Sequence, residues 1–159
     1  MTDMKFQDLL KDKSKINLTD ICKAWQWLIA DQKEVLLVTI FGDLFLIGKS
    51  SEINWLDTSV GKLTRVANDV EDFKAQLKNS DNYDNWFLGW LHDDIEKSGI
   101  VLKGNEVFSF KINPILGDEY TFENISPLDI NVHFQLSGQI CEQTKDFPDG
   151  TKINIVTSK

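Results

Sequence analysis

The sequence is short of the residues on which many catalytic and metal sites depend. Its 159 residues include only two cysteines, Cys22 and Cys141, and two histidines, His92 and His133. Neither cysteine belongs to a Cys-x-x-Cys pair or lies near a histidine at metal-ligand spacing. One long-range disulfide fits the count, but we favour two reduced thiols packed in the core. We therefore expect no cofactor, no metal site and no cysteine nucleophile.

Long apolar runs are absent as well. A membrane-spanning helix needs roughly 18 or more apolar residues, and no segment of the chain approaches that length. The N-terminal sequence MTDMKFQDLLKDK has no apolar signal-peptide core. We expect a cytoplasmic protein that does not bind membranes. Its length suits one α+β domain over residues 1–159, with sub-lobes at 1–80 and 81–159.

Basic residues are fewer than acidic residues, and most of the difference lies in the C-terminal half. The formal net charge is −8. Residues 1–80 hold 11 Lys and Arg against 12 Asp and Glu, whereas residues 81–159 hold 6 against 13. This balance argues against nucleic-acid binding, which needs a basic surface to displace counterions from phosphates. It favours solubility alone, or a basic partner attracted by the field.

The hydrophobic pattern predicts the fold class. Four β-rich segments, EVLLVTIFG, LFLIG, EINWLDT and KLTRVAN, are separated by turn residues and predict a four-strand antiparallel meander over residues 34–67. Amphipathic segments precede and follow it. The prediction is an α+β fold, in which an antiparallel β-meander of about four to six strands packs with about four to five helices around a single compact core.

Helical spacing of apolar residues marks two short segments. The first is residues 17–31, with Thr19 as the predicted N-cap. The second is residues 68–79, where Asn68 or Asp69 caps the start.

A third helix is predicted over residues 81–99, with Gly99 as its C-cap. Its apolar side is expected to be buried and its polar side to face solvent. The predicted buried side consists of Trp86, Phe87, Trp90 and Leu91; the predicted solvent side consists of Asp84, His92, Asp93 and Glu96.

The C-terminal third is predicted to mix strands with one helix. Residues 106–112 alternate as a strand, residues 117–125 suit a short extended segment, and residues 151–157 suit a final strand. Residues 126–145 fit two patterns, because positions 128–136 alternate like a strand while apolar residues also recur every four positions. Their length and a Ser126-Pro127 start favour a helix with apolar residues on two faces, kinked at Gly138.

Few motifs suggest catalysis. The sequence has no nucleophile elbow, P-loop or dinucleotide fingerprint. His92-Asp93-Asp94 resembles a metal or phosphohydrolase signature, but adjacent helical residues point about 100° apart and cannot converge without help. A solvated helix face is the simpler interpretation, although Asp94 falls towards the aromatic side of the helical wheel.

Acid–base catalysis would therefore rest on carboxylates. Asp118, Glu119 and Glu123 crowd around Tyr120 and Phe122. Alternation on an extended segment would divide these acids between two faces and turn the aromatics inward. That geometry suits a binding edge better than an active site, so we expect no enzyme.

Three runs of the sequence resemble a known bacterial family. They are GDLFLIGKSSEINWLDTSVGKLTRVANDVEDFKAQL, KINPILGDEYTFENI and QICEQTKDFPDG. Their pattern, over roughly residues 35–155, resembles the C-terminal domain of type VI secretion immunity proteins, a family whose named example protects against a DNase toxin. Asp118 stands where the family pattern has a glycine.

The resemblance implies an immunity protein that neutralises a type VI effector toxin. A toxin nuclease carries a basic cleft, and an acidic inhibitor can mask such a cleft and associate quickly with it. The expected partner is thus a basic nuclease domain, bound through the acidic C-terminal half. The predicted partner-binding residues are Asp81, Asp84, Asp93, Asp94, Glu96, Asp118, Glu119 and Glu123.

Two other functions remain open from the sequence. A regulatory or scaffold module that binds a host protein or small ligand would be favoured by a concave pocket lined by Trp86, Trp90 and Tyr120. A carboxylate hydrolase would require Asp94, Asp118 and Glu119 to converge in a cleft with raised pKa values.

Overall fold

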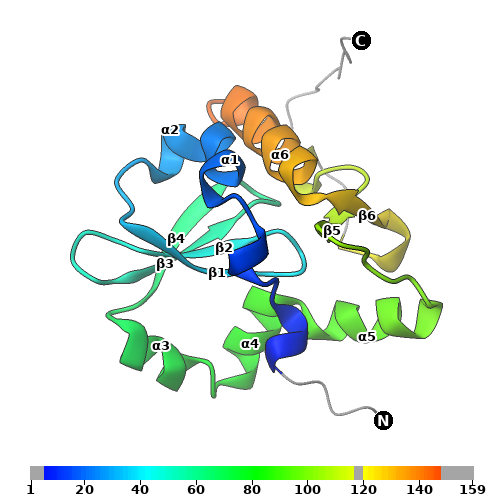
Figure 1. The fold of residues 1–159 in the computed structure, drawn as a ribbon, viewed down its shortest axis with the longest axis horizontal. Helices are drawn as coiled ribbons and strands as arrows, with labels where there is room; N and C mark the ends of the chain where they lie inside the picture. Colours follow the sequence, from blue (N-terminus) through cyan, green and yellow to red (C-terminus); the bar gives the residue numbers. More distant parts are fainter. Residues whose placement is uncertain (1–5, 117–119, 148–159) are drawn as a thin grey trace.

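The structure is a computed structural model that describes residues 6–116 and 120–147. A four-stranded antiparallel sheet lies between two layers of helices, and a two-stranded antiparallel ribbon stands beside it (Figure 1). The α+β class predicted from the sequence is confirmed.

The meander predicted over residues 34–67 forms the larger sheet, with its strands in sequence order. Gly42 closes the first turn with a φ of 75°, a left-handed conformation that side chains rarely adopt. A Cβ on Gly42 would lie 2.1 Å from Nε2 of His133, so the helix behind the turn also requires glycine. The strands are β1 Glu34–Val38, β2 Leu44–Ile47, β3 Ile53–Asp57 and β4 Lys62–Ala67.

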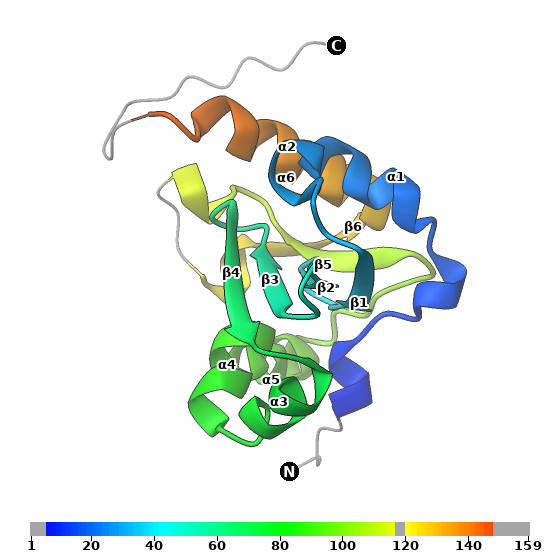
Figure 2. The same cartoon turned by 90° about the vertical axis from the view of Figure 1, so that its left-hand side faces the viewer.

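Both faces of this sheet are buried along β2, whereas β4 is largely exposed. Along β2 the side chains alternate, so that Leu44 and Leu46 join one apolar cluster and Phe45 joins another on the opposite face. The sheet therefore separates the core into two clusters, one under each helical layer (Figure 2). Near-continuous apolar strands are the expected result of burial on both faces.

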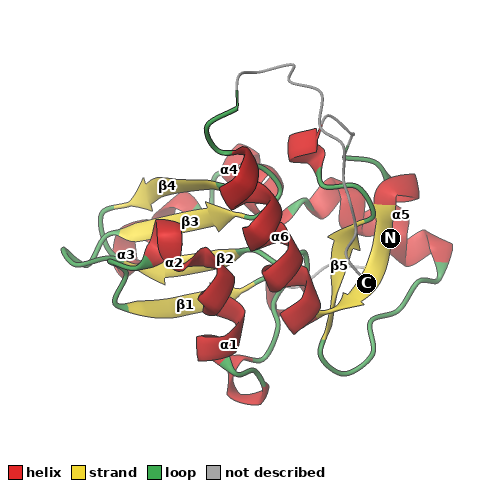
Figure 3. Ribbon diagram, turned by 90° about the horizontal axis from the view of Figure 1, so that it is seen from above, coloured by secondary structure: helices red, strands yellow, loops and turns green. Residues whose placement is uncertain are grey.

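One helical layer contains the N-terminal helices and the long C-terminal helix, which crosses the sheet in Figure 3. Asn17 is the N-cap of the first helix, because its side chain accepts a hydrogen bond from the Asp20 backbone at 3.1 Å. The prediction of Thr19 as the cap was wrong by two residues. This layer consists of α1 Leu18–Cys22, the 3-10 turn η3 Lys23–Trp25, α2 Gln26–Ile29 and α6 Ile130–Thr144.

The other layer contains three helices. Asp69 caps the first by accepting from the Asp72 backbone at 2.7 Å, as one of the two predicted alternatives. The single helix predicted over 81–99 was wrong, because the chain breaks at Leu88, whose φ of 49° is left-handed. The predicted C-cap at Gly99 is confirmed. This layer consists of α3 Val70–Gln76, α4 Ser80–Phe87 and α5 Gly89–Ser98.

The ambiguous segment 126–145 contains both predicted structures. Ser126 and Pro127 lie in β6 Ile125–Asp129, which pairs with β5 Glu106–Phe110. The helix cap is Asp129, whose carboxylate accepts from the backbone of Asn131 and Val132, so the cap predicted at Ser126 was wrong.

Gly138 of α6 lies against the N-terminal helices. A Cβ there would lie 2.6 Å from the carbonyl oxygen of Ala24. This close approach of α6 to η3, rather than the predicted kink, explains the glycine.

Short 3-10 turns complete the described chain. One of them replaces part of the extended segment predicted over 117–125. Asp118, Glu119 and the strand predicted at 151–157 lie outside the described residues. The turns are η1 Phe6–Leu9, η2 Lys13–Lys15, η4 Pro114–Leu116 and η5 Phe122–Asn124.

Both cysteines are free, as predicted. Cys141 is buried and Cys22 is half-buried, and burial raises the pKa of both thiols, to about 12 and about 11 respectively. Within residues 6–116 and 120–147, no helix is both long enough and apolar enough to cross a membrane.

Candidate functional site: a pocket lined by aromatic residues and two carboxylates

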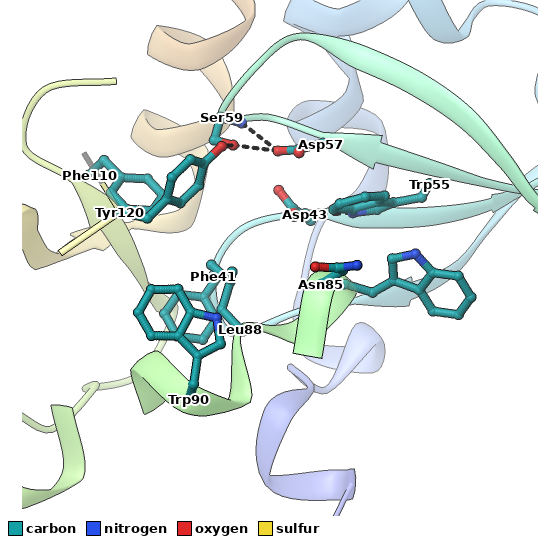
Figure 4. A pocket seen from close by; sticks show the side chains of 11 residues that line it. Phe41, Asp43, Trp55, Asp57, Ser59, Asn85, Leu88, Trp90, Phe110 and Tyr120 are labelled. Carbon is teal, nitrogen blue, oxygen red and sulfur yellow. Dashed lines mark hydrogen bonds between the residues drawn. The ribbon is translucent and has the colours of Figure 1, made fainter. Parts of the chain in front are cut away.

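A pocket of about 420 Å³ opens between the sheet, the α4–α5 pair and the β5 ribbon (Figure 4). This volume falls within the range of small-ligand sites. Its polar lining includes Asp43, Asp57, Ser59 and Asn85. Its aromatic lining consists of Phe41, Trp55, Trp86, Trp90, Phe110 and Tyr120.

The register of β2 and β3 brings the two aspartates together. Leu44 pairs with Leu56, so Asp43 and Asp57 follow as the next opposite positions where the strands end. The next pair along the ladder is Phe45 with Trp55, and its rings stack at 6.3 Å on the same face. Sheet alternation thus places both carboxylates beside Trp55, as Figure 4 shows.

Asp43 is held by hydrogen bonds on both carboxylate oxygens. Oδ1 accepts from the backbone N–H of Thr58 at 3.0 Å and from its hydroxyl at 2.9 Å. Oδ2 accepts from the indole N–H of Trp55 at 3.2 Å. Asp43 is only 7% exposed, so its orientation is fixed within the wall of the pocket.

Asp57 is held on one oxygen. Its Oδ1 accepts from the backbone N–H of Ser59 at 3.0 Å and from the Ser59 hydroxyl at 2.5 Å. The Ser59 hydroxyl also makes a hydrogen bond with the phenol of Tyr120, which links β3 to the η5 side of the pocket. Within the described chain, no hydrogen bond is made by Oδ2 of Asp57.

Burial and mutual repulsion disfavour the ionised form of these carboxyl groups. Burial raises the pKa of Asp43 well above its usual value, and the neighbouring Asp57 raises it further. Burial also raises the pKa of Asp57. The pKa of Tyr120 rises to about 12, first because of burial and then because of the negative charge at Asp57 and Asp43.

Within residues 6–116 and 120–147, neither pocket carboxylate forms an ion pair with a lysine or arginine. The pocket lining described here contains no lysine or arginine. Lys62 lies opposite Asp57 in the β3–β4 register, but the ion pairs among the described residues are formed elsewhere. The charge of Lys62 lowers the pKa of Asp57 by less than burial raises it, and no described cation contacts either carboxylate.

The break between α4 and α5 forms the outer wall. A left-handed leucine is strained, and Leu88 itself lines the pocket. The break changes the helical phase, so that Leu91 and Ile95 are buried while Trp90 is 48% exposed. Trp90 was wrongly predicted to be buried; it stands over the pocket instead (Figure 4).

A buried histidine supports the Gly42 turn and Thr58 behind the carboxylates. Nε2 of His133 lies 2.9 Å from the Gly42 carbonyl oxygen, which can only accept, so Nε2 carries the proton. Nδ1 then accepts from the Ser109 hydroxyl at 2.8 Å. Burial lowers the pKa of His133 to about 4, so the ring is neutral and structural.

The residues predicted as partner-binding divide into two groups. Six lie on exposed positions: Asp81 and Asp84 on α4, Asp93, Asp94 and Glu96 on α5, and Glu123 on η5. Asp118 and Glu119 belong to the part of the chain that the structure does not describe.

The histidine–acid run on α5 forms a different group from the one considered in the sequence. Ligand atoms of His92, Asp93 and Glu96 lie within 4.8 Å of one another, while Asp94 is outside the group. Helical i,i+3 and i,i+4 spacing explains this proximity. Both acids are exposed, and such groups commonly occur on solvated helix faces.

The pocket acids were not identified from the sequence, where Asp43 was interpreted only as a turn residue. The signal that could have identified them is a hairpin turn centred on Ser50. Asp43 and Asp57 are equally distant from Ser50 in sequence, so such a turn places them opposite each other. In contrast, the three residues Trp86, Trp90 and Tyr120 do line one concave pocket, as the ligand-binding hypothesis requires.

Part of the chain matches a known protein family. The segment from the end of β4 through most of α6 matches a family model described as "T6SS immunity protein Tdi1, C-terminal". Residues 67–141 match the C-terminal domain family of a type VI secretion immunity protein. The resemblance found in the sequence is confirmed over this immunity-family segment, which is shorter than the 35–155 first assigned.

The immunity-family segment supplies only part of the pocket. It includes Asn85, Trp90 and Tyr120, whereas Asp43 and Asp57 precede it. The two carboxylates therefore lie outside the matched region.

One solved structure supports the fold. The crystal structure of Atu4351 from Agrobacterium tumefaciens superposes with a TM-score of 0.52 at 14% sequence identity. The alignment covers 78% of this chain and 65% of that one, so this chain spans less than two thirds of Atu4351. At this identity the similarity concerns the fold alone. A search of curated proteins finds no match.

Proposed function

We propose that this protein is a cytoplasmic immunity protein that binds and neutralises a type VI secretion effector, and that the effector is a nuclease. The observation that carries the proposal is the match of residues 67–141 to the immunity family. Inhibition by binding requires a complementary surface rather than catalytic residues, so no enzymatic activity is proposed.

The surface we assign to the effector is the acidic face of α4 and α5, together with the pocket rim. Five exposed acids on these helices are accompanied by one lysine, Lys97. Such a field attracts a basic protein and accelerates association. Trp90 is exposed on α5, one helical turn before Asp93 and Asp94, and tryptophan is among the residues that most often dominate binding energy. The acids are Asp81, Asp84, Asp93, Asp94 and Glu96.

A second candidate function is a module that binds a small ligand. The aromatic pocket containing Trp86, Trp90 and Tyr120 favours it. The carboxylate-hydrolase alternative has less support, because Asp94 is exposed on α5 and does not line this pocket.

Co-expression distinguishes immunity from ligand binding. A candidate type VI effector nuclease is expressed in a bacterial host with or without the full chain. Immunity predicts that the chain restores growth and forms a complex with the effector. Continued toxicity despite soluble expression of the chain would contradict the proposal, and a complex with no effect on DNA or RNA cleavage would contradict the nuclease assignment.

A further inference from the structure

The pocket has an arrangement suited to a cation. Asp43 and Asp57 lie side by side in its wall, and six aromatic side chains surround them. Aromatic faces attract cations through the ring quadrupole, and this attraction strengthens where water is excluded. Carboxylates and aromatic rings together therefore favour a positively charged group over a neutral or anionic one.

Among the described residues, no lysine or arginine forms an ion pair with the two carboxylates, which leaves them available to a cation from a bound molecule. The described residues place no lysine or arginine in the pocket wall, and Asp57 forms no ion pair with Lys62. Oδ2 of Asp57 receives no hydrogen bond from the residues described, so this oxygen retains its accepting capacity. A bound cation would offset the repulsion between the two carboxylates.

A planar cation suits this site better than a compact one. A guanidinium group can stack on an aromatic face while its N–H groups donate to carboxylate oxygens, whereas an ammonium group acts as a hydrated point charge. Trp55 and Tyr120 stand on either side of the aspartates (Figure 4). Trp90 stands at the rim, 48% exposed, and offers the first aromatic surface to an entering group.

We propose that the pocket binds a guanidinium group supplied by an arginine side chain of the effector. This inference rests on the proposed function. The source is assigned to a protein because the exposed acids Asp93 and Asp94 follow the pocket residue Trp90 by one helical turn, and an acidic surface suits a basic macromolecule. Arginine is also enriched among the residues that anchor protein interfaces.

The direct test uses N-acetyl-arginine amide as a side-chain probe with the full chain. Binding is followed by the amide and indole N–H signals of Trp55 and Trp90 in nuclear magnetic resonance spectra. N-acetyl-citrulline amide, which has the same shape without the charge, is the control ligand. We expect the arginine probe to bind at least about tenfold more tightly than the citrulline probe. Equal binding, or no binding by either probe, would overturn the proposal.

Two variants locate the site. Asp57→Asn keeps an oxygen for the Ser59 hydrogen bonds and removes the charge, and Trp90→Ala alters an exposed residue with little risk to folding. We expect each to weaken the arginine probe by about tenfold. Asp20→Asn, at an exposed acid on α1 in the opposite helical layer, is the matched control and should leave binding unchanged. A loss with the control and none with Asp57→Asn would place the site elsewhere.

The effector assay separates this inference from the proposed function. If wild type protects cells and Asp57→Asn protects less well, the effector supplies the cation. Unchanged protection by Asp57→Asn together with probe binding would overturn the effector as the source and favour a free guanidinium ligand. Absence of protection by wild type contradicts the immunity function whatever the probe does.

Discussion

At the scale of single residues, Asp43 and Asp57 show how a sheet register can create a charged site that local sequence does not reveal. Each is unremarkable alone, one in a turn and one at a strand end. Where they face each other at the ends of β2 and β3, burial raises the pKa of both, and the charge of Asp57 raises the pKa of Asp43 further. The same register places Trp55 beside them to donate a hydrogen bond to Asp43.

We expect the free energy of unfolding to fall less steeply with rising pH in Asp57→Asn than in wild type. Folding raises the pKa of both carboxyl groups. Such a group contributes its full stabilisation of the folded state below the pKa it has in the unfolded chain, near 4. This contribution is lost as pH rises through the pKa of the folded state. Removing Asp57 removes its repulsion of Asp43. Urea unfolding of wild type and variant from pH 4 to 8 measures the difference. Asp84→Asn on the surface should reproduce the wild-type profile, and parallel profiles for wild type and Asp57→Asn would contradict the coupling.

We expect His133 to remain neutral, with its proton on Nε2, at pH 5.5. Its pKa is lowered to about 4 by burial, so the stability it contributes is complete above about 6.5 and is lost as pH falls towards 4. Nitrogen-15 spectra of the imidazole report both the charge and the tautomer. A ring found protonated at pH 5.5 would contradict the hydrogen bonds to Gly42 and Ser109.

At the scale of elements, the structure depends on where helices begin and end. The break at Leu88 separates α4 from α5 and brings Trp90 to the pocket. The start of α6 at Ile130, capped by Asp129, leaves the five residues Ile125–Asp129 free to pair with β5. In both places, a segment that was predicted as one long helix forms two elements instead: α4 and α5 in the first, and β6 and α6 in the second.

We expect Asp129→Ala to destabilise the protein by about 1 kcal/mol, the usual cost of losing an N-cap. Its carboxylate accepts from two backbone N–H groups at the start of α6, at 2.9 Å and 3.2 Å. Chemical denaturation measures the change. Asp146→Ala, an exposed acid just beyond the end of α6, makes the same change in charge without a cap. Equal effects of the two substitutions would contradict the capping role.

These elements also show what the sequence could and could not predict. The four-strand meander followed from β-branched runs separated by turn residues, and the cap at Asp69 from a local pattern. The break at Leu88 had no such signal, because tertiary contacts hold a strained leucine against its local preference. For the pocket, the sequence offered Trp86, Trp90 and Tyr120 only as a lining that would favour ligand binding. It gave no sign of the two acids, because their proximity depends on the long-range register of β2 and β3.

At the scale of the whole molecule, charge and shape are divided between the two helical layers. The α3–α5 layer carries the acidic face and one wall of the pocket, and it belongs to the immunity-family segment. The layer containing α1 and α6 packs on the opposite face of the sheet (Figure 1). The proposed contact with the effector therefore involves one face of the molecule.

We expect charge reversal on that face to slow association with the effector by about tenfold at low salt, and by much less at high salt. The variant changes Asp84, Asp93 and Glu96 to lysine. A matched variant changes Asp20, Glu142 and Asp146, exposed acids near the opposite layer, to lysine. Both shift the net charge equally. Stopped-flow association rates compare them, and equal slowing would show that net charge rather than the acidic face is responsible.

The most direct test of the proposed binding face is the affinity of the effector for Trp90→Ala, measured by isothermal titration calorimetry. Trp90 is 48% exposed beside the pocket, so its loss should leave the fold intact while weakening binding by about 30-fold or more, as expected for a central interface tryptophan. Val101→Ala, at a 71% exposed apolar residue outside the pocket, should bind like wild type. Wild-type affinity for Trp90→Ala would contradict the assignment of this face to the effector.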